Sequence, residues 1–180
     1  MKKYLTTKNI VLCGIIAGLY FILTIISGPL AFAGGSFQIR ISEILNIFVF
    51  FNPVLIFGVS LGCLISNIFS MYGILDIIVG TLATILADLI IIFISRHIKN
   101  LFAGIICNVL VNTFLVPFAF ILVDKTLLTF EFYFLSALWI FVGEVIICLL
   151  IGYPLFLFII LKNRKLLKLL GFTQNIDIKW

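Results

Sequence analysis

The stretch ISEILNIFVFFNPVLIFGVSLGCLISNIFS, residues 41–70, decides how many helices this chain forms. Its Asn52-Pro53 dipeptide either kinks one long helix or separates two short ones, because proline lacks an amide donor and restricts the residue before it. Two helices would bring both chain ends to the same side of the fold, whereas one kinked helix would place them on opposite sides. The surrounding composition and charge distinguish these two interpretations.

The composition is that of an integral membrane protein. Of 180 residues, 64% are hydrophobic and 11% are charged, and the mean hydropathy is +1.36. Soluble domains are about 45–50% apolar and about 25% charged. Backbone polar groups must be paired inside a bilayer, so spanning segments are helices or closed barrels. The apolar runs lack the alternation that barrel strands require. We therefore expect an all-α membrane protein with a single transmembrane domain over residues 1–180.

The basic residues favour two helices in 41–70, because Lys and Arg collect on the cytoplasmic side of membrane proteins. With two helices, ten of the twelve Lys and Arg residues lie on the side of both termini, and only Arg40 and Lys125 lie opposite. One kinked helix would move Arg96 and Lys99 outside. The sequence therefore predicts six transmembrane helices with both termini in the cytoplasm. The expected segments are 10–27, 41–52, 54–70, 74–95, 102–123 and 133–161.

Ionisable side chains inside these segments are candidates for a binding site, since a charge near the bilayer centre costs about 2.5–3.5 kcal/mol on insertion scales. Glu43 falls in the polar island FQIRISE, residues 37–43, at the predicted outer end of the second helix. It can pair with Arg40, three residues earlier, or contact a ligand, or do both. Glu144 has no basic residue nearby in sequence and indicates an internal polar site; a protonated Glu bonded to a neighbouring helix is the alternative. Asp88 is expected to be structural.

The sequence lacks the residues that ATP hydrolysis and metal binding usually require. The sequence contains no GxxxxGK[ST] phosphate loop, so we do not expect this chain to hydrolyse ATP. His97 is the single histidine, and no His, Cys and acid cluster has metal-ligand spacing. We expect no catalytic site, no metal, no cofactor and no nucleic-acid partner. A membrane-embedded enzyme and a structural helix-packing protein remain as alternatives from other classes.

Two small-residue faces predict close helix contacts. Gly14 and Gly18 lie four residues apart in the first segment, and Gly58 and Gly62 repeat this spacing in the third. Such faces let another helix approach closely in a membrane.

Several of these residues together resemble the QueT family over most of residues 10–155. The runs are Gln38-Ile-Arg-Ile-Ser-Glu43, Gly58-x-x-x-Gly62-Cys63, Ser66-Asn67, Gly73-Ile-Leu-Asp76 with Gly80-Thr-Leu-Ala-Thr84, and Gly143-Glu144. The resemblance implies the six-helix S-component fold of energy-coupling factor (ECF) transporters. It implies uptake of a queuosine precursor, a 7-deazaguanine such as the aminomethyl or nitrile form. An S component for another vitamin or purine-like solute is the alternative within this class.

The resemblance also implies partners, namely an EcfT-like transmembrane coupling protein and two cytoplasmic ATPase subunits, in addition to the lipid bilayer. In S components a small-residue face on the first helix meets the coupling protein. Gly14 and Gly18 occupy those positions in this sequence.

The chemistry of a 7-deazaguanine fits the polar residues of this chain. A guanine-like edge presents an N–H and an amino group side by side, which one carboxylate can accept, while its carbonyl needs a donor. Either Glu43 or Glu144 can supply that carboxylate. A flexible outer loop over residues 28–40 is expected to cover the base. The expected substrate-binding residues are Gln38, Arg40, Glu43, Asn67, Tyr72, Asp76, Asn112, Trp139 and Glu144.

Overall fold

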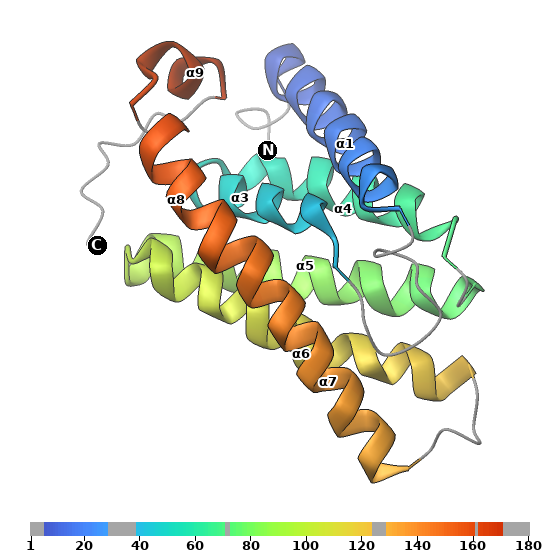
Figure 1. Cartoon of the computed structure of the whole chain (residues 1–180). Helices are drawn as coiled ribbons and strands as arrows, with labels where there is room; N and C mark the ends of the chain where they lie inside the picture. The colour runs from blue at the N-terminus through green and yellow to red at the C-terminus, as the bar shows by residue number, and fades with distance from the viewer. Residues whose placement is uncertain (1–5, 29–38, 71–72, 124–128, 161, 171–180) are drawn as a thin grey trace.

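The computed structural model describes residues 6–28, 39–70, 73–123, 129–160 and 162–170, and the regular elements within them are helices (Figure 1). Five α-helices of twelve or more residues form the frame. They are α1 (Thr7–Ser27), α4 (Ile56–Asn67), α5 (Gly73–His97), α6 (Leu101–Val123) and α7 (Phe130–Glu144). The predicted all-α class is thereby confirmed.

Within the described residues, four helical stretches are long and apolar enough to cross a membrane. They are Thr7–Ser27, Gly73–His97, Leu101–Phe118 and Phe130–Phe158, and two shorter apolar helical stretches cover Ile41–Phe51 and Pro53–Asn67. Large hydrophobic side chains such as Ile22, Leu82 and Leu138 are more than half exposed on the outside of the bundle. This distribution fits a surface covered by lipid. The crossing count of six and the cytoplasmic termini stay predictions.

Residues 41–70 form a series of short helices. The 3-10 helix η1 (Ile41–Asn46) leads into α3 (Ile47–Phe51), and the 3-10 helix η2 (Pro53–Leu55) leads into α4. Asn52 separates the two halves in an extended conformation, and its side-chain oxygen accepts a hydrogen bond from the amide of Val54. Pro53 begins the next helix, where its missing N–H would have no intrahelical partner anyway.

The short helix α3 lies at the centre of the fold. All five of its side chains, Ile47 to Phe51, are buried, as expected of a helix that is apolar on every face. Its neighbours include α5 and α6, which lie side by side across the bundle (Figure 1). This central position carries the preceding helix η1, with its polar residues, into the interior.

Helices α1 and α4 touch through the second small-residue face. A Cβ atom added to Gly58 would lie 2.7 Å from the Cys13 carbonyl oxygen, and one added to Gly62 would lie 2.6 Å from Tyr20 Cβ. Only glycine fits this close approach. By contrast, a Cβ added to Gly14 or Gly18 would meet nothing within 4 Å among the described residues.

The last long helix is continuous but irregular. After α7 the chain passes through the π-helix η4 (Val145–Gly152), α8 (Tyr153–Leu155) and the π-helix η5 (Phe156–Ile160). A Cβ at Gly152 would lie 3.2 Å from Ile44 Cγ1, so the glycine lets this helix pack closely on η1. Glu144 lies where the α-helix ends and the π-helix begins, and π-turns occur frequently at functional sites.

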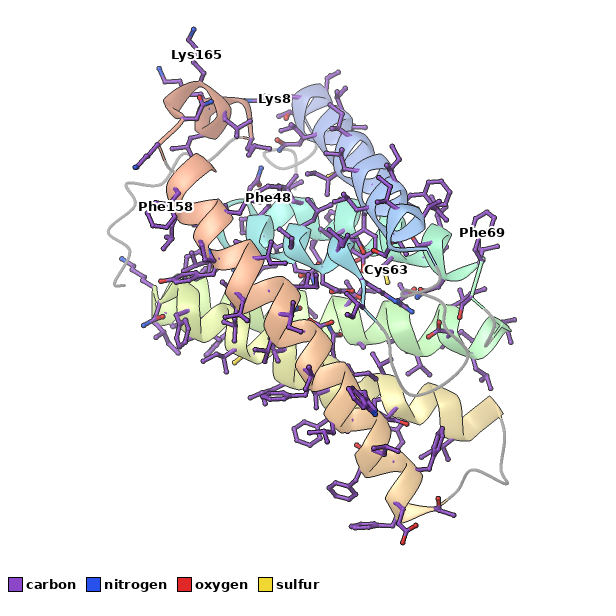
Figure 2. The ribbon with its side chains drawn as sticks, in the orientation of Figure 1. Lys8, Phe48, Cys63, Phe69, Phe158 and Lys165 are labelled. Carbon is purple, nitrogen blue, oxygen red and sulfur yellow. The ribbon has the colours of Figure 1, made fainter. Side chains whose placement is uncertain are left out.

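The two ends of the described chain meet. The short basic helix α9 (Arg164–Leu169) lies beside the start of α1, where Lys8 Nζ donates to the Lys168 carbonyl oxygen at 2.9 Å. Lys8 and Lys165 accordingly appear at the same end of the molecule (Figure 2). Asn52 Nδ2 donates to the Leu170 carbonyl oxygen at 2.9 Å and joins this end to the turn between the two short central helices.

Candidate functional site

Arg40 is buried at the start of η1 and links three elements. Its guanidinium donates from Nη1 to Asn67 Oδ1 on α4 at 2.9 Å and from Nη2 to Asp76 Oδ2 on α5 at 3.2 Å. The sequence spacing left open whether Glu43 pairs with Arg40, contacts a ligand, or does both. In the structure the carboxylate that pairs with Arg40 is Asp76, and Arg40 is 9% exposed and Asp76 0% exposed because η1 enters the interior.

Glu43 is held by two short hydrogen bonds and one longer contact. Tyr20 Oη donates to Oε1 at 2.6 Å, and Asn46 Nδ2 donates to Oε2 at 2.7 Å. Asn112 Nδ2 adds a longer contact to Oε2 at 3.4 Å. Charge-assisted hydrogen bonds of these lengths are among the stronger ones in proteins. The carboxylate of Glu43 is therefore fixed in position before any ligand arrives.

Glu144 is held more loosely. Asn112 Nδ2 donates to Oε1 at 3.3 Å, while Asn108 Nδ2 and Cys148 Sγ approach Oε2 at 3.5 Å and 3.4 Å. The nitrogen contacts are longer than the 2.7–3.2 Å that is usual for N–H···O bonds, and the thiol is a weak donor. This carboxylate therefore keeps capacity for stronger donors.

Three asparagines connect the two glutamates. Asn112 Nδ2 contacts both carboxylates, and Asn46 Nδ2 bridges Glu43 to Asn108 Oδ1, 2.9 Å away. Asn108 and Asn112 lie four residues apart and therefore share one face of α6. The side-chain amides of the three asparagines all donate hydrogen bonds within this network, and most of the acceptors are carboxylate oxygens of the two glutamates.

A small cavity opens beside this network. Its volume is about 20 Å³, which is room for about one water molecule. Ligand pockets measure about 300–1,000 Å³, so this cavity is much smaller than a pocket that encloses a small molecule. The lining residues come from η1, α5, α6 and α7: Arg40, Glu43, Gly80, Thr84, Asn112, Val116, Ile140 and Glu144.

Residues of α4 and α5 form the wall of the site against which Arg40 packs. A Cβ at Gly80 would lie 2.6 Å from Asn67 Nδ2, so glycine is needed for Asn67 to reach the guanidinium. Thr84 Oγ1 lies 3.2 Å from Cys63 Sγ, whose sulfur is seen between α1 and α5 in Figure 2. Asn67 Nδ2 also approaches that sulfur at 3.5 Å. The wall is thus a continuous set of polar contacts.

The structure brings four of the predicted residues to one cavity and places others around it. Arg40, Glu43, Asn112 and Glu144 line it, and Asn67 and Asp76 hold Arg40. Trp139 is 43% exposed on α7 and is absent from the lining. Gln38, Tyr72 and positions 29–38 of the predicted loop lie outside the described residues.

Some residues of the site were not predicted. Tyr20 looked like one more aromatic in an apolar segment, and nothing local to it indicates a partner on η1. Thr84 did carry a signal, because it follows Asp76 and Gly80 at intervals of four and so shares their helical face. Asn46 likewise lies three residues after Glu43, a spacing at which helical side chains meet.

The helices are apolar and several are long enough to span a membrane. They enclose a network of ionisable and amide side chains, so the chain is a multi-pass membrane protein with an internal polar site. Comparison with known proteins gives a narrower assignment. The chain belongs to the QueT transporter family, whose model matches residues 10–161.

One curated relative supports the same assignment. The "Queuosine precursor transporter QueT" of Lactococcus lactis subsp. cremoris (strain MG1363) is 46% identical over 85 residues. That match covers 47% of this chain and 49% of the relative, so it extends over about half of each protein. No solved structure matches the chain.

Proposed function

We infer that this chain is the substrate-binding S component of an ECF-type importer and captures a queuosine precursor of the 7-deazaguanine class. The observation that carries this proposal is the pair of glutamates at one cavity, of which Glu43 is buried and Glu144 is half-buried. Glu43 is rigidly held, whereas Glu144 retains capacity for ligand donors. A guanine-like edge supplies an N–H and an amino group side by side, which are the donors that such a carboxylate accepts.

The neighbouring donors suit the rest of the base. The carbonyl of a 7-deazaguanine needs a hydrogen-bond donor, and the guanidinium of Arg40 and the amide of Asn112 both line the cavity. Gly80, Val116 and Ile140 leave apolar surface for the flat ring. Because the cavity holds about one water, the base can enter only if the lining elements separate.

The exposed face of α1 supports the proposed partnership. Gly14 and Gly18 are exposed, and a Cβ there would meet no described atom within 4 Å, whereas Gly58 and Gly62 are already used inside the bundle. A small face with no internal contact suits a helix of the EcfT-like coupling protein. Two cytoplasmic ATPase subunits would supply the energy, since this chain has no phosphate loop of its own.

Binding by the purified full chain tests this function. Aminomethyl- and nitrile-substituted 7-deazaguanines, guanine, riboflavin and thiamine are titrated in turn by calorimetry. We expect a deazaguanine to bind most tightly, and Glu144→Gln to weaken it about 10- to 100-fold, because a carboxylate that accepts two hydrogen bonds is lost. Tighter binding of riboflavin or thiamine would assign the chain to another solute. Unchanged deazaguanine affinity in Glu144→Gln would remove Glu144 from the site.

A further inference from the structure

Asp88 on α5 is the ionisable residue that the site described above leaves unexplained. It is 0% exposed, and neither of its carboxylate oxygens has a hydrogen-bond partner among the described residues. A buried polar group without a partner costs about 1–3 kcal/mol, and a charged one costs more. Asp76, the other buried aspartate of α5, differs because Arg40 pairs with it.

The packing of α5 against α6 and α3 fixes the depth of Asp88. These two long helices run antiparallel, and a Cβ at Gly104 of α6 would lie 3.9 Å from Ile91 Cγ2 and 3.3 Å from Phe50 Cδ2. This contact defines one level of the bundle, formed by three chain segments that are distant in sequence.

A second level of the bundle lies one helical turn closer to the cavity than this contact. On α5 the turn goes from Ile91 to Asp88, and on α6 it goes from Gly104 to Asn108, about 5.4 Å in each case. Four residues before Phe50 stands Asn46, the last residue of η1. Asn46 and Asn108 are joined by a 2.9 Å hydrogen bond, which confirms that they share a level. One further turn along α5 leads to Thr84, which lines the cavity. Asp88 therefore lies one helical turn beyond the part of α5 that lines the cavity, on the same face of the helix as Thr84.

Asn46 adds a third unsatisfied acceptor at this level. Its Nδ2 donates to Glu43 Oε2 and to Asn108 Oδ1, and these two acceptors fix the orientation of the amide. Its Oδ1 is buried without a hydrogen-bond partner among the described residues. Together with the two oxygens of Asp88, three acceptor oxygens beneath the cavity have no donor within the described chain. A primary ammonium group has three N–H donors and one positive charge.

We propose that Asp88, together with Asn46 Oδ1, binds the cationic amino group of the substrate. This assignment rests on the function proposed above and makes it more specific. The base is read by Glu144 at the level of the cavity, and a substituent with a primary ammonium group extends one level deeper. The charge selects the aminomethyl form of a 7-deazaguanine over the nitrile form, since a nitrile offers neither charge nor donor.

Calorimetry with two matched ligands tests the assignment. The full chain is titrated with the aminomethyl and the nitrile 7-deazaguanine, and then Asp88→Asn is titrated with both. We expect the wild type to bind the aminomethyl form about 10- to 100-fold more tightly. Asp88→Asn should remove most of that preference by weakening only the aminomethyl form. Asp76→Asn is the matched control, and it should weaken both ligands alike because it releases Arg40.

Each result is decisive. Equal weakening of both ligands by Asp88→Asn, or a wild type that binds the nitrile form as tightly as the aminomethyl form, would overturn the role of Asp88 while leaving the proposed function intact. If neither deazaguanine binds the wild type, the proposed function fails, and this assignment fails with it. Should Asp88→Asn not fold, the interaction can be removed on the ligand instead, because N-acetylation of its amine abolishes the positive charge. N-acetylation should weaken the binding of the aminomethyl form to the wild type by a similar factor.

Discussion

At the scale of single residues, Arg40 and Asp76 connect stability with binding. Their ion pair is buried, with side chains 8% and 0% exposed, so neither charge is stabilised by water. Replacing one partner of such a pair costs about 3–5 kcal/mol, because the other charge is left buried alone. Replacing both by apolar residues of similar volume is often nearly neutral.

We therefore expect Arg40→Met and Asp76→Leu each to lower the free energy of unfolding by about 3–5 kcal/mol, and the double variant to recover most of the loss. Equilibrium unfolding in detergent measures these three values. Ligand binding should not recover in the double variant, since Arg40 also lines the cavity. Losses that simply add in the double variant would contradict a direct interaction between the two side chains.

The same scale shows why some site residues were predictable and others were not. Arg40, Glu43 and Glu144 stand out because a charge in an apolar segment needs a reason to be there. Their actual partners depend on contacts between distant segments, such as Tyr20 with Glu43, 23 positions apart. No local pattern specifies which of several tyrosines reaches a carboxylate on another helix.

At the scale of helices, the two glycine pairs have the same spacing but different environments. Gly58 and Gly62 face α1 at distances that exclude a Cβ atom, while Gly14 and Gly18 face outward. Gly58→Ala or Gly62→Ala should destabilise the chain by about 1–3 kcal/mol through overpacking. Gly14→Ala with Gly18→Ala is the matched control and should leave the unfolding free energy unchanged or slightly higher. Thermal unfolding in detergent compares them.

Larger side chains at the outward pair separate docking from binding. Gly14→Leu with Gly18→Leu should abolish uptake by cells that also express the coupling protein and the ATPases, while the purified variant still binds ligand. Lost binding in that variant would argue against a docking role for this face. The spacing alone could not distinguish the two glycine pairs, because it does not reveal which side of a helix meets its own bundle; only the family resemblance pointed to Gly14 and Gly18 as the docking pair.

At the scale of the whole molecule, composition alone indicated helices in a membrane, since 64% hydrophobic residues without strand-like alternation leave few other folds. The burial of Arg40, Ser42 and Glu43, which belong to the polar island, was harder to foresee. Its described part, from Ile39 onward, enters the interior because α3 is apolar on every face and is enclosed by other helices. An argument from the polarity of the island itself points toward water, which is the opposite direction.

The small volume of the cavity has a kinetic consequence for the proposed function. A base of the proposed class does not fit a space of about 20 Å³, so the proposed capture requires the surrounding helices to separate first. In stopped-flow experiments the observed association rate should therefore rise with ligand concentration and then level off at the opening rate of the protein, on the microsecond to millisecond scale of lid motions. A rate that stays proportional to concentration throughout would mean that the empty protein stands open. With a plateau, the speed of the first step of uptake is a property of the protein and not of how often the solute collides with it.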